Sequence, residues 1–213
     1  MAILITGASG GLGTTVYQAF AATSAKVIGA ARSGSDLDVD LSTAAGAQSM
    51  VDQVLERGPL DALVHLVGAF AGGSIAETDD KTWDMLMNVN LRAAFLAMRA
   101  SLKPMLAQKR GRIVVIGARA AIETMPNFSA YAVSKAGVVA LVRNVAAEVR
   151  DHGITCNVVL PSTIDTEVNR KAMPNADHSK WVTPQSIAGL LVWLVSDAAK
   201  DVNGAVIPIY GQA

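Results

Sequence analysis

The chain has 213 residues, which suffice for one well-packed domain and are few for two. Its 18 basic and 18 acidic residues balance, so we expect neither nucleic acid nor a membrane surface as a partner. The single cysteine, Cys156, excludes an internal disulfide framework and fits a reducing compartment. Because the N-terminal segment has no signal-peptide pattern and no apolar run is long enough to span a bilayer, we expect a cytoplasmic protein.

Segments with the patterns of strands and helices alternate along the whole chain. Because strands that alternate with helices form parallel sheets covered on both faces, we expect one Rossmann-type α/β domain over residues 1–213, doubly wound, with about seven parallel strands. The polar segment 162–182 is too long for a plain connection and is a candidate substrate loop. Strands are predicted at 2–6, 26–31, 36–40, 61–67, 112–116, 154–160 and 206–209, and helices at 14–22, 43–55, 82–107, 131–149 and 184–195.

A glycine-rich turn, TGASGGLG, follows the first predicted strand and precedes the first predicted helix. Gly7 permits a tight turn, Gly11 lets backbone N–H groups approach a pyrophosphate, and Gly13 lets the helix pack closely on the strand. The helix N-terminus adds a partial positive charge facing the phosphates. The turn therefore predicts a dinucleotide site, with cofactor contacts from Thr6, Gly7, Ser9, Gly11, Leu12 and Gly13.

The end of the second predicted strand indicates which dinucleotide is preferred. It reads Ala30-Ala31-Arg32-Ser33 and has no acid to accept hydrogen bonds from the adenosine ribose of NAD. The Arg32 guanidinium suits the 2′-phosphate of NADP. We therefore expect NADP(H) to be preferred, with NAD(H) as the second choice. The alternative is that Arg32 is an ordinary solvated arginine after a strand.

Tyr131 and Lys135 are the candidate catalytic pair. They are four residues apart on a predicted helix and so share one face. A fixed ammonium near a tyrosine favours the phenolate, so we expect Lys135 to lower the pKa of Tyr131. An isolated Tyr-x-x-x-Lys is usually an ordinary helix face. Here the glycine turn upstream and the segment 161–166 downstream favour catalysis.

These motifs together resemble the short-chain dehydrogenase/reductase family over nearly the whole chain. The turn has the family's TGxxxGxG spacing, residues 131–135 read YAVSK, residues 88–91 read NVNL, and residues 157–166 read NVVLPSTIDT, with Ser162 where glycine is usual. The resemblance implies an NAD(P)H-dependent oxidoreductase acting on a small molecule. Tyr131 donates a proton as hydride arrives, Lys135 also holds the nicotinamide ribose, and Asn90 supports a water on Lys135.

The resemblance also extends the binding site and implies an assembly. The long helices 82–107 and 131–149 would form the interface of a homodimer or homotetramer. Asp40 would contact the adenine amine. No metal is expected. Further cofactor contacts would come from Leu41, Gly68, Pro161, Ile164 and Thr166.

One departure from the family pattern concerns the substrate. Ala118 stands where the family has a serine that orients a substrate carbonyl, and losing such a donor can cost about 3 kcal/mol of transition-state stabilisation. The quinonoid dihydropteridine reductase branch shares that alanine. Residues 68–73, 117–121 and 160–177 resemble its segments, although the branch has an acid near Ala31 and prefers NADH. The resemblance implies substrate contacts from Ala118, Arg119, Tyr131 and Asn169.

Two other functions stay open. One is a carbonyl or enone reductase that lacks the serine, and the other is a dinucleotide-binding regulatory protein with vestigial chemistry. Retention of Tyr131, Lys135 and Asn90 argues against the second. His65 is expected to be a packed strand histidine. The three tryptophans, Trp83, Trp181 and Trp193, are expected to be packing residues.

Overall fold

The computed structural model describes residues 1–212, and within them all strands belong to one sheet. The strand order is β3-β2-β1-β4-β5-β6-β7, and every neighbouring pair is parallel. This arrangement confirms the predicted doubly wound α/β fold. The strands are β1 (Ala2–Thr6), β2 (Lys26–Ala31), β3 (Leu37–Asp38), β4 (Leu60–His65), β5 (Gly111–Ile116), β6 (Ile154–Pro161) and β7 (Val206–Ile209).

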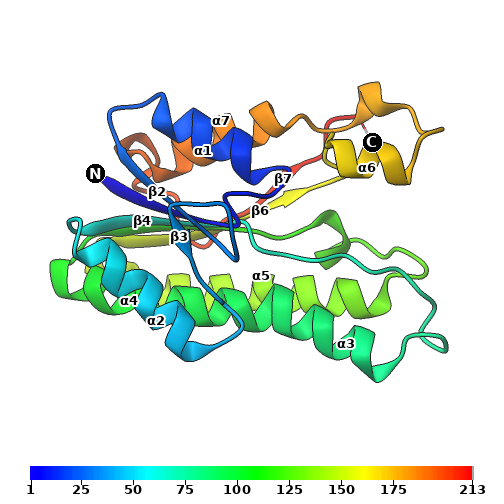
Figure 1. The fold of residues 1–213 in the computed structure, drawn as a ribbon, viewed down its shortest axis with the longest axis horizontal. Helices are drawn as coiled ribbons and strands as arrows, with labels where there is room; N and C mark the ends of the chain where they lie inside the picture. Colours follow the sequence, from blue (N-terminus) through cyan, green and yellow to red (C-terminus); the bar gives the residue numbers. More distant parts are fainter. Residues whose placement is uncertain (213) are drawn as a thin grey trace.

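Helices cover both faces of the sheet (Figure 1). Helices α1 (Gly13–Ala21) and α7 (Pro184–Val195) lie on one face, and α2 (Ala44–Leu55), α4 (Ala93–Gln108) and α5 (Ser129–Val149) lie on the other. The remaining helical segments are α3 (Asp80–Leu86), η1 (Met87–Arg92), η2 (Arg119–Ala121), η3 (Arg150–His152), α6 (Glu167–Ala172), η4 (His178–Lys180) and η5 (Asp197–Ala199).

Strand β1 shows how the two hydrophobic cores form. Its residues are all buried, as expected for a central parallel strand, and successive side chains point to opposite faces. Leu4 packs in the core beneath α2, α4 and α5, whereas Ile3 and Ile5 pack with Phe20 of α1 and Leu191 of α7. The continuous apolar run in the sequence therefore serves two cores at once.

The predicted helix over 82–107 is not a single α-helix. It consists of α3, the π-helical segment η1 and α4 in succession. The π turn brings Asn90 to the inside, where it is 1% exposed and hydrogen-bonded. Apolar spacing alone gives no sign of such a turn, and π-helical segments often occur at functional sites.

The predicted substrate loop 162–182 contains two short helices, so it is more ordered than a plain loop. Thr166 caps α6, accepting a hydrogen bond from the Asn169 N–H at 3.3 Å. Asp177 caps η4 in the same way. The predicted start of the following helix is confirmed, because Thr183 is its N-cap and Pro184 its first residue.

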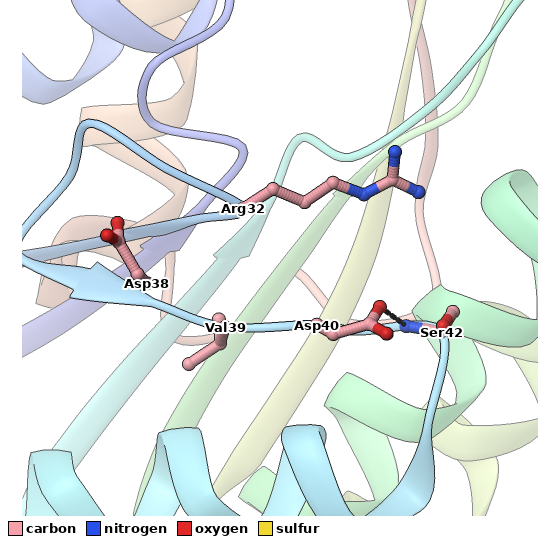
Figure 2. A pocket seen from close by; sticks show the side chains of 5 residues that line it. All are labelled: Arg32, Asp38, Val39, Asp40 and Ser42. Carbon is pink, nitrogen blue, oxygen red and sulfur yellow. Dashed lines mark hydrogen bonds between the residues drawn. The ribbon is translucent and has the colours of Figure 1, made fainter.

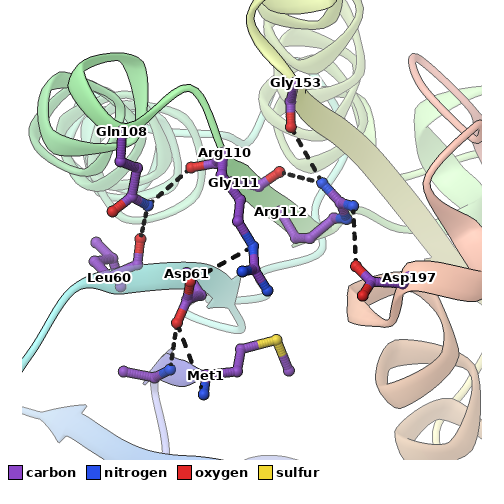
Figure 3. A network of polar contacts seen from close by, with 10 residues as sticks. Met1, Leu60, Asp61, Gln108, Arg110, Gly111, Arg112, Gly153 and Asp197 are labelled. Carbon is purple, nitrogen blue, oxygen red and sulfur yellow. Dashed lines mark hydrogen bonds and ion pairs between the residues drawn. The ribbon is translucent and has the colours of Figure 1, made fainter.

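A polar network ties the strands together at their amino ends (Figure 3). Asp61 accepts a hydrogen bond from the Ala2 N–H at 2.7 Å and pairs with Arg110 at 3.7 Å. Arg112 donates to the Gly153 carbonyl at 3.3 Å and pairs with Asp197 at 3.5 Å. These contacts fix the end of the sheet opposite the one where the predicted site residues gather.

Candidate active site

The glycine turn after β1 has the geometry of a phosphate cradle. Gly7 has a φ of 75°, which favours glycine, and a Cβ on Gly13 would lie 2.0 Å from the Gly7 carbonyl oxygen, where no side chain fits. Within residues 1–212, the N–H groups of Ser9, Gly11 and Leu12 have no hydrogen-bond partner. Three donors at the start of a helix therefore remain available to an anion.

Two predicted cofactor segments lie next to each other across this turn. A Cβ built on Gly11 would be 3.6 Å from the Thr166 side chain, so the turn after β1 and the segment after β6 are in contact distance. Pro161 ends β6 and is buried, and the backbone of Ile164 bridges to Val182. The fold thus brings together residues more than a hundred positions apart in the sequence.

A hollow of about 360 Å³ lies beyond the ends of β2 and β3. Figure 2 shows the exposed Arg32 side chain extended along one side of it and the Asp40–Ser42 pair on the other. Asp40 accepts a hydrogen bond from the Ser42 N–H at 2.9 Å. The Ser42 side chain first, and this N–H second, hold the pKa of Asp40 below its usual value. Leu41 between them is buried.

Arg32 makes no hydrogen bond or ion pair within the described residues, so its guanidinium is free to meet a phosphate. The cradle and this hollow fit the phosphates and the adenosine end of a dinucleotide.

Lys135 is a buried ammonium beside the turn that follows β4. It is 4% exposed, and its Nζ donates to the Ile116 carbonyl at 3.2 Å. Burial lowers the pKa of Lys135 to about 8. A Cβ on Gly68 would lie 3.1 Å from this Nζ and 3.2 Å from Asn90 Oδ1. Glycine at position 68 therefore leaves room for the ammonium to approach the cofactor side of the sheet.

Tyr131 differs from the expectation in its acidity. It lies half-buried in the first turns of α5, and burial raises its pKa to about 12. The expected lowering by Lys135 is wrong for this structure, because burial of the phenol disfavours the charged phenolate and raises the pKa. Tyr131 therefore keeps its proton at neutral pH, as a proton donor requires.

Asn90 joins three parts of the site. Its Oδ1 accepts from the Ala69 N–H at 2.8 Å, and its Nδ2 donates to the Ala69 carbonyl at 3.0 Å and to Ser134 Oγ at 2.9 Å. The side chain thus clamps the turn after β4 to α5. Ser134, which the sequence did not single out, completes this clamp. A water on Lys135 supported by Asn90 stays a prediction.

Phe70 is a site residue that the sequence analysis gave no role of its own. Its side chain is exposed, and its ring lies 5.0 Å from the Tyr131 ring and 5.2 Å from the Phe128 ring, both edge-on. The backbone of Gly73 pairs with Phe128 and holds the two segments together. An aromatic residue inside the glycine-rich segment 68–73 was the available signal. The Phe70 ring therefore lies in contact with the candidate proton donor and with Phe128.

Of the predicted substrate residues, Ala118 lies just beyond the end of β5, whereas the side chains of Arg119 and Asn169 bind other parts of the chain. Ala118 follows β5, is 7% exposed and has no hydroxyl neighbour in sequence. Arg119 pairs with Glu123 at 2.5 Å, and its guanidinium lies 4.9 Å from the centre of the Tyr210 ring. Asn169 donates from Nδ2 to the Ile164 carbonyl at 2.8 Å and so shapes its own loop. Substrate contacts from these two side chains stay predictions.

The comparisons with known proteins place the chain in a family. Residues 7–211 match the sequence profile of the family described as Enoyl-(Acyl carrier protein) reductase. Inactive 2-(S)-hydroxypropyl-CoM dehydrogenase 2 of Xanthobacter autotrophicus is 35% identical over 208 residues, covering 91% of this chain and 90% of its own. The chain belongs to the short-chain dehydrogenase/reductase family.

Two further relatives agree with this assignment. The short-chain dehydrogenase/reductase chain is 30% identical over 224 residues to the 3-oxoacyl-[acyl-carrier-protein] reductase MabA of Mycobacterium tuberculosis, with coverage of 98% of this chain and 91% of that one. A structure from Beutenbergia cavernae, described as a candidate NAD(P)-dependent gluconate 5-dehydrogenase with bound NADP at low occupancy, has a TM-score of 0.90 at 28% identity and coverage of 99% and 95%. The family is one of NAD(P)-dependent oxidoreductases, as the motifs implied.

Other sequence expectations have mixed outcomes in this short-chain dehydrogenase/reductase. His65 is buried in a strand, as expected, and Cys156 is also buried in a strand. Trp181 is buried, but Trp83 and Trp193 are 39% and 43% exposed, so the packing role was wrong for these two. Over the described part of the chain, no helix has the length and apolarity to cross a bilayer.

Proposed function

We propose that this short-chain reductase uses NADPH to reduce a flat, conjugated substrate such as a quinonoid dihydropterin, with Tyr131 as the proton donor. The observation that carries the proposal is the alanine at position 118. The cofactor cradle, Tyr131, Lys135 and Asn90 all match the family pattern, whereas the hydroxyl that would orient a ketone is missing. A protein that had lost its chemistry altogether would have no reason to keep the other parts.

The missing hydroxyl matters differently for different substrates. Hydride addition to a ketone puts negative charge on one oxygen, so a hydrogen-bond donor aimed there is worth about 3 kcal/mol. In a conjugated imine the charge spreads into the ring, and a donor at one point has little to stabilise. The small side chain of Ala118 and the edge-on rings of Phe70 and Phe128 favour a planar guest beside Tyr131.

The chain's own residues supply the proton and hold its donor. A reduced nicotinamide, when bound, supplies the hydride. The Tyr131 hydroxyl carries its proton at neutral pH because burial raises its pKa to about 12. Lys135, a cation up to about pH 8, stabilises the negative charge that grows on the phenol oxygen as the proton leaves. Asn90 keeps the turn at Gly68 and Ala69 in register with α5 during this step.

The preference for NADPH rests on the hollow after β2. Arg32 is exposed there and makes no ion pair within the described residues, and no acid stands at Ala30 or Ala31 to favour a ribose hydroxyl. The structure from Beutenbergia cavernae contains NADP on a chain of the same fold. Both points support the 2′-phosphorylated cofactor.

The second candidate function is reduction of a carbonyl compound. It is favoured by the name of the Mycobacterium tuberculosis relative, a 3-oxoacyl-[acyl-carrier-protein] reductase. The relative from Xanthobacter autotrophicus is named inactive, so turnover by this chain has to be measured rather than taken from its family.

The test is NADPH oxidation by the purified protein with quinonoid dihydropterin generated in situ, compared with simple ketones, an enone and a 3-oxoacyl thioester. A reaction mixture without the protein gives the uncatalysed background, and the Tyr131→Phe variant shows whether turnover depends on the proton donor. We expect kcat/KM for the pterin to exceed that for every carbonyl substrate by at least about a hundredfold, given one donor worth about 3 kcal/mol. Turnover of carbonyl substrates alone would establish the second candidate instead.

We also propose that the chain forms a homodimer or homotetramer through α4 and α5. Phe95 and Leu106 on α4 are 41% and 38% exposed, and large exposed apolar side chains gathered on one element often mark an interface. Light scattering after gel filtration tests this proposal. A monomer at micromolar concentration would contradict it.

A further inference from the structure

His65 is a buried titratable residue that the proposed reaction does not yet use. It ends β4, is 1% exposed, and pairs in register with Thr6 of β1 and Val115 of β5. Val115 belongs to the core beneath α4 and α5. Because residues in register on neighbouring strands point to the same face, the His65 side chain points toward α5, which carries Lys135.

One ring nitrogen of His65 is satisfied and the other is not. Nδ1 lies 2.8 Å from Thr6 Oγ1. Nε2 is buried and has no hydrogen-bond partner within the described residues. A buried polar atom without a partner costs free energy, so an unpartnered Nε2 beside a site needs an explanation.

The Lys135 ammonium, in turn, has N–H donors without acceptors in the described part of the chain. An ammonium has three N–H donors, and within residues 1–212 the one hydrogen bond from the Lys135 side chain goes to the Ile116 carbonyl. The nearby Asn90 Oδ1 already accepts from Ala69. Burial, and next to it the charge of Lys135, lower the pKa of His65 to about 3. The imidazole is therefore neutral over the whole working range of pH.

We propose that His65 is a positioning residue for Lys135, whose neutral imidazole, anchored by Thr6, offers the Nε2 lone pair to the ammonium directly or through one water. Next to a cation the favoured tautomer has its proton on Nδ1, which donates to Thr6 Oγ1 and leaves Nε2 as the acceptor. The acceptor keeps Lys135 protonated and oriented. The inference rests on the proposed function, in which Lys135 supports proton donation by Tyr131, and on the expectation from the family resemblance that Lys135 holds the nicotinamide ribose.

The experiment compares His65→Leu with His65→Asn. Leucine fills a similar volume and cannot accept a hydrogen bond, whereas asparagine keeps an acceptor. The dissociation constant of NADPH is measured by fluorescence between pH 6 and 10, together with the pH profile of kcat/KM. In His65→Leu we expect the alkaline loss of binding and of activity to begin about one pH unit lower, because losing a hydrogen bond to a charged group makes the buried cation easier to deprotonate. His65→Asn should follow the wild type.

Further measurements distinguish a variant that does not fold from a wrong inference about His65 and from a wrong proposed function. Thermal unfolding at pH 7.5 checks that each variant is folded. Thr6→Val keeps the imidazole and removes its anchor, so it should shift the alkaline limb in the same direction even where the leucine variant does not fold. If wild type binds NADPH and neither variant shifts the limb, His65 only packs and the inference is overturned. If wild type binds no nicotinamide cofactor, the proposed function fails and the inference fails with it.

Discussion

The Lys135 ammonium lies 3.2 Å from the carbonyl oxygen of Ile116, a contact that ties helix α5 to the end of strand β5. Burial is the cause that raises the pKa of Tyr131, which lies in the first turn of the same helix. Tyr131 is thereby a protonated acid with a cation one helical turn away. That arrangement suits proton donation and leads to the first prediction.

Tyr131→Phe should lower kcat by at least about a hundredfold, the usual share of a positioned general acid. The dissociation constant of NADPH should stay within about threefold, because the phosphate and adenosine contacts lie at the glycine turn and at the hollow near Arg32. Stopped-flow turnover and fluorescence titration measure the two. Tyr17→Phe is the matched control, since the Tyr17 hydroxyl binds Asp36 at 3.1 Å and takes no part in the site. Near wild-type turnover in the first variant would remove Tyr131 from its proposed role.

Arg32→Ala should weaken NADPH binding by about ten- to a hundredfold and leave NADH binding within about threefold. Charge-assisted hydrogen bonds to a phosphate are worth about 1.5–3 kcal/mol, and NADH has no phosphate at that point. Isothermal titration with both reduced cofactors measures the difference. Arg57→Ala is a suitable control, because Arg57 is an exposed arginine after α2. Equal losses for NADPH and NADH would mean that Arg32 only supports the loop.

His65 should make the fold sensitive to acid. Its pKa is about 3 in the folded protein and near 6.5 in the unfolded chain, so between these values the unfolded chain binds a proton that the folded protein excludes. Stability is therefore lost as pH falls below about 6.5, at up to about 1.4 kcal/mol per pH unit from this residue. Urea unfolding at pH 7, 5.5 and 4.5 measures the slope. His65→Asn should flatten it, and His152→Asn, at an exposed position, should not.

The elements of the fold were predictable because each depends on local pattern. The apolar runs gave β1, β2 and β7 to the residue, and the helix predicted at 184–195 is α7 to the residue. The π turn at η1 was not predictable, because the contacts that accompany it, from Asn90 to Ala69 and Ser134, join segments far apart in the sequence.

The site was predictable where a motif carries its own geometry and unpredictable where the environment decides. Glycines 7 and 13 are needed for backbone reasons that any phosphate turn shares. The direction of the Tyr131 pKa shift depends on how deeply the phenol is buried, and the position of Arg119 depends on Tyr210, which a distant segment brings beside it. The contact of Phe70 with Tyr131 likewise exists only in the folded chain.

Phe70→Ala should lower kcat/KM for a flat ring substrate by about three- to tenfold, since an aromatic contact is worth about 0.5–1.5 kcal/mol beyond its area. Small aliphatic ketones should lose less, because they present no ring to the exposed Phe70 face. The comparison uses the same NADPH assay with both substrates. Trp193→Ala is the control, because Trp193 is an exposed aromatic residue on α7 at the opposite face of the sheet. A loss of equal size for every substrate would indicate that Phe70 supports Tyr131 rather than selecting the substrate.

Ala118→Ser restores the one hydroxyl that the family pattern has and this chain lacks. Position 118 is 7% exposed and has an extended backbone, with a φ of −163° and a ψ of 156°, so a serine fits without strain. If the natural substrate spreads its charge over a ring, the new donor stabilises nothing in the transition state. The rate with quinonoid dihydropterin should then stay level or fall slightly through lost room for the ring.

The same substitution should raise ketone reduction by about tenfold or more, because a donor near the developing alkoxide is worth up to about 3 kcal/mol when well aimed. Ala120→Ser is the control, since Ala120 is equally buried in the adjoining η2 turn. Only the variant at position 118 should gain ketone activity. A serine at position 118 that speeds the pterin reaction instead would show that a localised oxyanion forms there. The substrate would then be a carbonyl compound, and the reason offered for alanine at this position would be wrong.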